Sequence, residues 1–187
     1  MFVGRILAEE YPGEYAESGL DSLERIYPRF HFLPFFRGML RLRQGNSTQA
    51  LEWFREAEPL QPTEDSRALA AFYSGYSLGM EGRWQESLPH FSRAVEKSPE
   101  NHAFRNQRGV AYFQTGHYER AAEDFSAALE IDPGSALDMA NLGLCYKFSG
   151  KKAAAADFLR TSLEMDPSLD FAWNHWQELC KDSETNA

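Results

Sequence analysis

The sequence predicts an all-α fold in which helical hairpins repeat along the chain and stack into a solenoid. Prolines recur at a spacing of 34 residues over most of the chain, and glycine, alanine and phenylalanine recur in fixed phase with them. With 187 residues, of which 43% are hydrophobic, the chain is long enough for one repeat array with a continuous core.

The proline period divides the chain into units. The prolines that mark it are Pro28, Pro62, Pro99, Pro133 and Pro167. Each step is 34 residues except that from Pro62 to Pro99, which is 37, so three residues are inserted near the sequence TEDSR. Proline ends a helix because it lacks the N–H that another turn would need. Pro59, just before the insertion, indicates a local irregularity there.

Two glycines recur in every unit. One is expected inside the first helix, where a side chain would hold the second helix away, and the other at the turn between the helices. The first set is Gly38, Gly75, Gly109 and Gly143, and the second is Gly45, Gly82, Gly116 and Gly150.

The second helix of each unit carries a small, a large and another small residue at i, i+4 and i+7. This spacing places all three on one face of a helix. The sets are Ala50, Phe54, Ala57; Ser87, Phe91, Ala94; Ala121, Phe125, Ala128; and Ala155, Leu159, Ser162.

These landmarks resemble the tetratricopeptide repeat (TPR) family, whose unit is a 34-residue helix-turn-helix. The resemblance implies a right-handed superhelical solenoid, and we expect one TPR domain over residues 1–187. Its expected repeats are residues 31–64, 68–101, 102–135 and 136–169.

The two ends of the chain differ from these repeats. Residues 1–30 are expected to form a degenerate or capping repeat, because Ala16, Leu20 and Leu23 keep the second-helix spacing. Residues 170–183 are expected to form a C-terminal capping helix with Ser168 as N-cap, and residues 184–187 a tail. An uncovered N-terminal edge would allow the chain to form a homo-oligomer there.

Composition excludes several functions. A formal net charge of -9 argues against a nucleic-acid partner, and no apolar run reaches the roughly 20 residues that would span a bilayer. Cys145 and Cys180 lack metal-binding spacing, so a reducing, cytoplasmic location is expected. The five histidines show no ligand spacing, and no catalytic motif is present. We therefore predict no catalytic residue, metal or cofactor, and no enzymatic activity.

The TPR resemblance also implies a peptide-binding surface on the first helices of the repeats. The residues expected there are Phe32, Phe35, Met39, Leu69, Phe72, Tyr76, Met80, Asn106, Val110, Phe113, Leu137, Asn141 and Phe148. The same register includes Gln114, Leu144 and Lys147. The alternative is that the aromatic residues of this set are ordinary core between repeats, or that residues 1–30 fold across them.

Two TPR subclasses do not fit the sequence. The carboxylate clamp for acidic chaperone tails needs Lys, Asn and Arg where this chain has residues such as Phe72, Tyr76 and Val110. An asparagine ladder needs repeated Asn where only Asn141 occurs. We therefore expect a non-enzymatic protein–protein interaction module that binds an apolar peptide. The alternatives are a dedicated chaperone of a secreted or assembling partner, a self-associating structural solenoid, and a domain that serves an attached enzyme.

Overall fold

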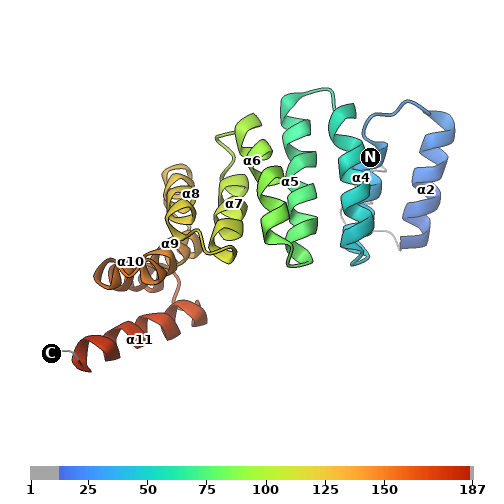
Figure 1. The fold of residues 1–187 in the computed structure, drawn as a ribbon. Helices are drawn as coiled ribbons and strands as arrows, with labels where there is room; N and C mark the ends of the chain where they lie inside the picture. The colour runs from blue at the N-terminus through green and yellow to red at the C-terminus, as the bar shows by residue number, and fades with distance from the viewer. Residues whose placement is uncertain (1–12, 186–187) are drawn as a thin grey trace. The chain divides into compact units, whose positions relative to one another are not determined.

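The computed structural model describes residues 13–185 of the chain, with side chains described for residues 15–181. Every regular element in this range is an α-helix, which confirms the all-α prediction (Figure 1). The helices are α2 (Gly13–Ile26), α3 (Leu33–Arg43), α4 (Ser47–Leu60), α5 (Glu64–Met80), α6 (Trp84–Lys97), α7 (His102–Gln114), α8 (Tyr118–Ile131), α9 (Ala136–Phe148), α10 (Lys152–Met165) and α11 (Asp170–Thr185).

The chain forms two compact units, Met1–Pro99 and Glu100–Ala187. We call them the N-terminal and C-terminal units. Within each unit a helix packs mainly on the helices before and after it in the chain, as Figure 1 shows for α4, α5 and α6. The hairpins α3–α4 and α5–α6 lie in the N-terminal unit, and α7–α8 and α9–α10 lie in the C-terminal unit. The repeat boundaries and the single-domain assignment stay predictions.

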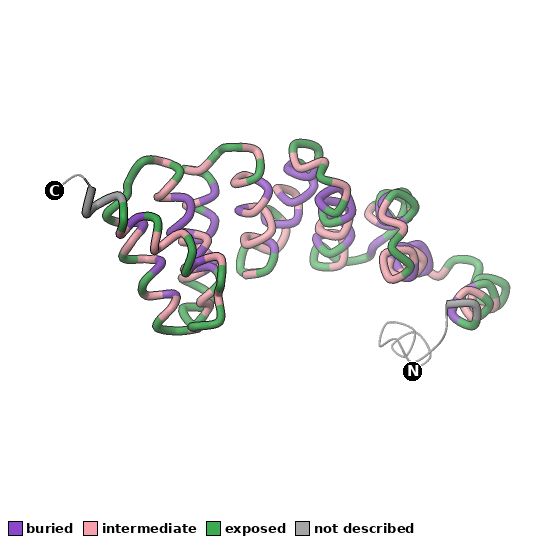
Figure 2. The backbone as a smooth tube through the Cα atoms, turned by 90° about the horizontal axis from the view of Figure 1, so that it is seen from below, coloured by how far each residue is buried: buried purple, intermediate pink, exposed green. Residues whose placement is uncertain are grey.

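The second-helix landmarks form the core of each hairpin. All twelve side chains are at most 1% exposed, and Figure 2 shows buried residues recurring along the helices. The first glycine of each hairpin faces the large landmark residue. A methyl group on Gly38 would lie 2.7 Å from the Phe54 ring, and one on Gly75 would lie 2.9 Å from the Phe91 ring. A side chain at these positions would therefore separate the two helices.

The second glycine of each hairpin ends the first helix. Gly45, Gly82, Gly116 and Gly150 have φ values of 75°, 72°, 79° and 80°, a left-handed conformation that residues with a Cβ rarely adopt. The next helix begins within two residues of each of them. The glycine therefore permits the tight turn that the sequence predicts.

Polar side chains cap several helix starts. Asn46, Thr63, Asn101 and Ser135 each accept a hydrogen bond from a backbone N–H in the first turn of the following helix. Such caps satisfy donors that have no partner within the helix. Thr63 and Ser66 form a reciprocal capping box at the start of α5.

The three-residue insertion extends α5. This helix has 17 residues, whereas α7 and α9 have 13 each, and it begins at Glu64, before the predicted repeat start at residue 68. Pro59 and Pro89 both lie inside continuous helices, α4 and α6. The irregularity predicted near Pro59 is thus an added turn at the start of α5.

The described parts of the two ends are helical. In α2, Ala16 and Leu20 are buried, as their second-helix spacing predicts, whereas residues 1–12 lie outside the described residues. In α11, Ala172 and Leu179 are buried against α9 and α10. Ser168 is not the N-cap of α11, because the helix begins at Asp170; the Ser168 hydroxyl donates a hydrogen bond to the carboxylate of Asp166, 2.7 Å away. The helix extends to Thr185, and residues 186–187 of the predicted tail are not described.

Candidate functional site

A pocket of about 280 Å³ lies within the C-terminal unit. Four helices of that unit form its walls. The lining residues are Val110, Phe113 and Gln114 from α7, Phe125 from α8, Leu137, Asn141 and Leu144 from α9, and Phe171 from α11. Six of these side chains are apolar and two are amides, and none of them carries a charge.

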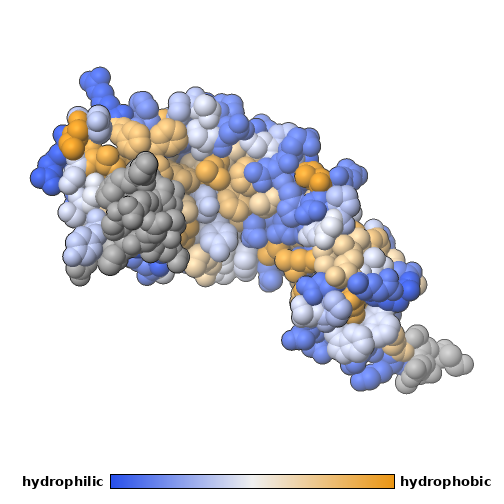
Figure 3. Space-filling model, turned by 180° about the vertical axis from the view of Figure 1, so that it is seen from behind, coloured by the Kyte–Doolittle hydropathy of each residue, from blue (hydrophilic) through white to orange (hydrophobic). Residues whose placement is uncertain are grey.

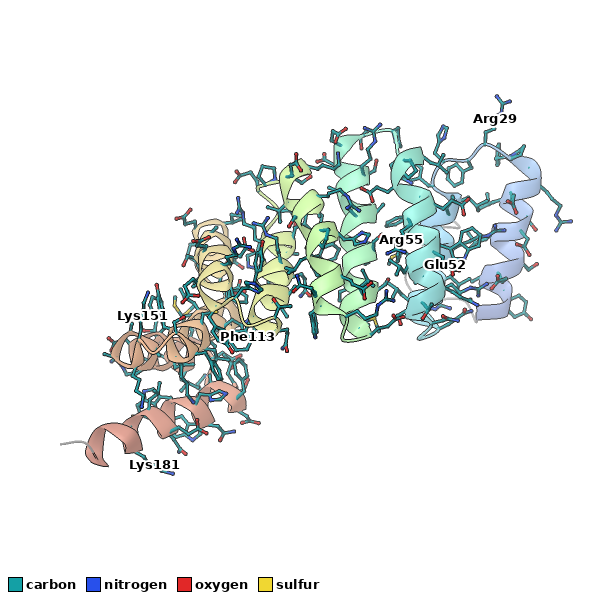
Figure 4. All side chains as sticks on the ribbon, in the orientation of Figure 1. Arg29, Glu52, Arg55, Phe113, Lys151 and Lys181 are labelled. Carbon is teal, nitrogen blue, oxygen red and sulfur yellow. The ribbon has the colours of Figure 1, made fainter. Side chains whose placement is uncertain are left out.

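Helical periodicity explains why these residues meet. On α9, Leu137, Asn141 and Leu144 are spaced i, i+4 and i+7, so they follow one face of the helix. On α7, Val110 is followed by Phe113 at i+3, near the C-terminal end of the helix, where Figure 4 labels this side chain. Because α7 and α9 are the first helices of successive hairpins, these two faces border the same pocket.

Six residues of the register expected at a peptide-binding surface line this pocket: Val110, Phe113, Gln114, Leu137, Asn141 and Leu144. Phe148, also expected there, is an exposed ring whose centroid lies 5.4 Å from that of Phe113. Sequence reasoning missed Phe125 and Phe171. The sequence predicts Phe125 only as a core residue of its hairpin and Phe171 only as part of the capping helix, and no sequence signal indicates that either borders a pocket.

A buried polar network joins α7 to α9. The carboxylate of Asp138 is 0% exposed, and His102 and Asn106 bind its two oxygens from α7. Ser135 caps the backbone N–H of the same residue. Asn106, which the sequence predicts at the peptide-binding surface, thus links the two helices that carry most of the pocket lining.

A second polar contact fixes α11 against α9. The ammonium group of Lys147 donates hydrogen bonds to Glu178 and to Nδ1 of His175, the latter at 2.8 Å. The hydrogen bond from Lys147 holds the pKa of the Glu178 carboxyl below its usual value. Together with the buried residues of α11, this contact fixes the helix that contributes Phe171.

The N-terminal unit presents a second set of apolar residues, along α5. Leu69, Tyr76 and Met80 are 37%, 39% and 53% exposed, at a spacing that keeps them on one face. Phe72 is partly buried on the same face, and its ring lies 5.7 Å from the buried ring of Phe91. Figure 3 shows hydrophobic side chains gathered on one face of this unit.

The phenylalanines of α3 have different environments. Phe35 is only 8% exposed, because its ring packs against Phe54 and against Tyr73 of the following hairpin. It is therefore a core residue in this structure. Phe32 is partly buried and contacts the ring of Phe36, while Met39 packs against the cluster around Phe35 and Phe54.

Side chains that could ligate a metal do not cluster in the described part of the chain. No group of three or more His, Cys, Asp or Glu side chains there could hold a metal ion. Cys145 is buried in the core, and burial raises the pKa of its thiol to about 12. Among the described helices, none is both long and apolar enough to cross a membrane.

Comparison with known structures returns TPR folds. YrrB, a TPR protein with an unusual peptide-binding site, superposes with a TM-score of 0.75 at 21% identity, covering 86% of this chain and 83% of its own. MamA gives a TM-score of 0.71 at 20% identity, covering 79% and 85%. The second TPR domain of human RPAP3, in complex with the HSP70 peptide SGPTIEEVD, gives 0.57 at 22% identity, covering 60% and 93%. At these identities the similarity is one of fold.

The sequence itself matches two TPR family models, one over residues 67–136 and the other over residues 139–169. Curated protein sequences returned no significant match. The two family matches together span more than half of the chain and cover most of the hairpins α5–α6, α7–α8 and α9–α10. The chain therefore belongs to the tetratricopeptide repeat family.

Proposed function

We propose that this protein is a non-enzymatic protein-interaction module that binds a peptide segment of its partner. An uncharged, bulky side chain of that segment enters the pocket of the C-terminal unit. The observation that carries the proposal is the lining of the pocket, which has six apolar side chains, two amides and no charge. A charged side chain would lose its hydration in this pocket without gaining a partner of opposite charge. The uncharged lining therefore favours an apolar side chain.

The volume of the pocket suits one anchor residue. A cavity of about 150 Å³ lined by apolar side chains holds a benzene molecule, and drug-sized ligands occupy roughly 300–1,000 Å³. The pocket, at about 280 Å³, lies between these limits. It has room for one large aliphatic or aromatic side chain together with adjacent main chain.

The amide of Asn141 would bind the main chain of the peptide. Its side chain lines the pocket, and within the described residues it makes no hydrogen bond. An extended peptide has backbone N–H and C=O groups that need partners, and an amide can both donate and accept. Asn141 thus complements the apolar walls with a contact that any peptide sequence can use.

The acidic peptides bound by some structural neighbours contrast with this ligand. The first TPR domain of Spaghetti (RPAP3) is bound to the HSP90 peptide SRMEEVD, which carries three carboxylate side chains. The pocket of the present chain has no cation in its lining, and its sequence lacks the clamp residues. These differences support an apolar rather than an acidic ligand.

The proposal is tested with a peptide array in which a fixed Gly/Ser frame carries Leu, Phe, Trp or Asp at its centre. The wild-type protein should retain the apolar members and not the Asp member. Leu137→Asp, at an exposed pocket residue, should abolish retention. The matched control is Ile131→Asp, at an exposed apolar residue outside the pocket in the same unit, which should bind as the wild type does. Equal binding by both variants would refute the pocket as the site.

The other predicted roles lead to different outcomes in solution. A dedicated chaperone would form a stable one-to-one complex with its partner, whereas a structural solenoid would oligomerise with rising protein concentration and no ligand. Sedimentation velocity of the purified protein over a hundredfold concentration range separates the second role from the proposed one. The absence of a nucleic-acid partner and the cytoplasmic location stay predictions of the same proposal.

A further inference from the structure

The capping helix α11 forms part of the wall of the pocket. Phe171, the second residue of this helix, lines the pocket together with residues of α7, α8 and α9. A helix that only covered the end of the array would bury its apolar face on α9 and α10 and leave the pocket unchanged. Here one aromatic ring of the cap is part of the pocket lining.

We propose that Phe171 determines which anchor side chain the pocket accepts, by setting how much of the pocket is open. This inference rests on the proposed function, since it concerns the same pocket and the same class of apolar anchor. The cap thereby acts as a specificity element for the size of the anchor, in addition to covering the array.

The packing of α11 supports this role because other residues hold the helix in place. Ala172 and Leu179 are buried in the cluster formed with α9 and α10, and both Phe171 and Trp176 pack against the same cluster. Lys147 adds the polar contact to Glu178. Several residues besides Phe171 therefore hold α11 in place. Truncating the ring of Phe171 should enlarge the pocket more than it moves the helix.

The size of the ring decides the direction of the effect. Removing the phenyl group opens a space for roughly one benzene ring, somewhat less than the ~150 Å³ of a cavity that holds benzene freely. A larger anchor then fits without displacing pocket side chains, whereas a smaller anchor loses van der Waals contacts with the missing ring. A variant that lacks the phenyl ring of Phe171 should therefore prefer a larger anchor side chain than the wild-type protein does, and tryptophan is the largest natural one.

The outward face of the same helix offers a matched control. Trp173 lies two residues after Phe171, is 47% exposed, and is not part of the pocket lining. Its ring contacts that of Trp176, with 5.4 Å between ring centroids. Replacing Trp173 removes an aromatic group of similar or larger size from α11 but leaves the pocket as it is.

The test measures the dissociation constants of N-acetyl-leucinamide and N-acetyl-tryptophanamide by NMR titration of the full-length protein. Phe171→Ala should raise the affinity for the tryptophan probe relative to the leucine probe by about tenfold, while Trp173→Ala should keep the wild-type ratio. If both variants keep the wild-type ratio, α11 is only a cap and the inference is wrong. If the wild-type protein binds neither probe, the proposed function itself fails.

A second measurement applies if Phe171→Ala does not fold, as judged by circular dichroism. Phe171→Leu retains most of the packing and should shift the ratio in the same direction by a smaller factor. In the wild-type protein, nuclear Overhauser contacts between the indole of the bound tryptophan probe and the Phe171 ring should also be present. An absence of these contacts, with contacts to Phe113 retained, would exclude Phe171 from the binding wall.

Discussion

Gly109 on α7 faces the ring of Phe125 on α8, and a methyl group on Gly109 would lie 3.1 Å from two ring carbons of Phe125. The same hypothetical methyl group would lie 3.3 Å from Cβ of Asp124. Phe125 is itself part of the pocket lining, so this glycine controls both the helix crossing and the position of one pocket wall.

Gly109→Leu should therefore destabilise the C-terminal unit. Overpacking of this kind costs about 1–3 kcal/mol, and the gain in helix propensity over glycine, at most about 1 kcal/mol, offsets only part of it. Differential scanning calorimetry should show a melting temperature several degrees below the wild-type value. Gly134→Ala, at an exposed turn of the same unit, is the control, and its melting temperature should stay close to the wild-type value. An unchanged melt for Gly109→Leu would disprove the close crossing.

Phe72 and Tyr76 should respond differently to replacement by serine. Phe72 contacts the buried ring of Phe91, so Phe72→Ser removes packing and should lower the free energy of unfolding by about 2 kcal/mol. Tyr76 is 39% exposed, so Tyr76→Ser should change the free energy of unfolding by less than about 1 kcal/mol. Urea denaturation of the two variants measures both values. Equal losses would show that α5 presents no free aromatic face.

Buried His90 should make the stability of the N-terminal unit depend on pH. Burial, together with the nearby cations Arg93 and Arg55, lowers the pKa of His90 to about 4, although Glu58 opposes the shift. The ordinary histidine pKa is about 6.5, so below that pH the unfolded chain binds a proton that the folded chain excludes. The stability associated with neutral His90 is thus fully present above pH 6.5 and is lost as the pH falls toward 4.

The measurement is urea unfolding at pH 7.5 and pH 4.5. His90→Gln keeps a side-chain acceptor for the Arg93 guanidinium, which lies 3.0 Å from Nδ1 of His90, and should reduce the loss of stability on acidification by about 2 kcal/mol. His31→Gln, at an exposed histidine of the same unit, is the control and should retain the wild-type difference between the two pH values. If His90→Gln lost as much stability between pH 7.5 and pH 4.5 as the wild-type protein does, the imidazole of His90 would not be buried in its neutral form.

The ion pair between Arg108 and Asp124 should be important for folding of the C-terminal unit. Arg108 donates two hydrogen bonds to the carboxylate, at 2.6 and 2.8 Å, and Asp124 is 3% exposed. Asp124→Ala leaves a partly buried guanidinium unpaired and should cost about 3 kcal/mol. Glu164→Ala, which removes an exposed partner of Arg160, should cost at most a few tenths of a kcal/mol. Thermal melts of the two variants make the comparison.

Steric pairs made most of the fold predictable from the sequence. The spacing between Gly38 and Phe54 is the same as that between Gly75 and Phe91. Such pairs are recognisable in the sequence by their regular spacing, and in the structure each pair is a close contact between two helices. The turn glycines are predictable for the same reason, because their left-handed backbone excludes most other residues. The all-α hairpin fold follows from these local requirements.

The candidate site was only partly predictable. The spacing of residues on one helix indicates which of them share a face, but not which other elements pack against that face. Phe35 is expected from the sequence at the peptide-binding surface, but it is buried here, and its ring packs against Tyr73 of the following hairpin. Phe125 and Phe171 line the pocket although neither lies on a first helix of a predicted repeat. Their role depends on the space left between packed helices, which no spacing of residues in the sequence encodes.

The contacts between consecutive helices also bear on how the protein folds. In each unit the principal packing joins elements that are adjacent in the chain, so the loops that must close on folding are short. Such low contact order favours folding within microseconds to milliseconds, and any hairpin can form first and serve as a template for the next. Amide exchange should accordingly be slowest in the interior helices of each unit and fastest at its terminal helices, as a gradient rather than a single cooperative step.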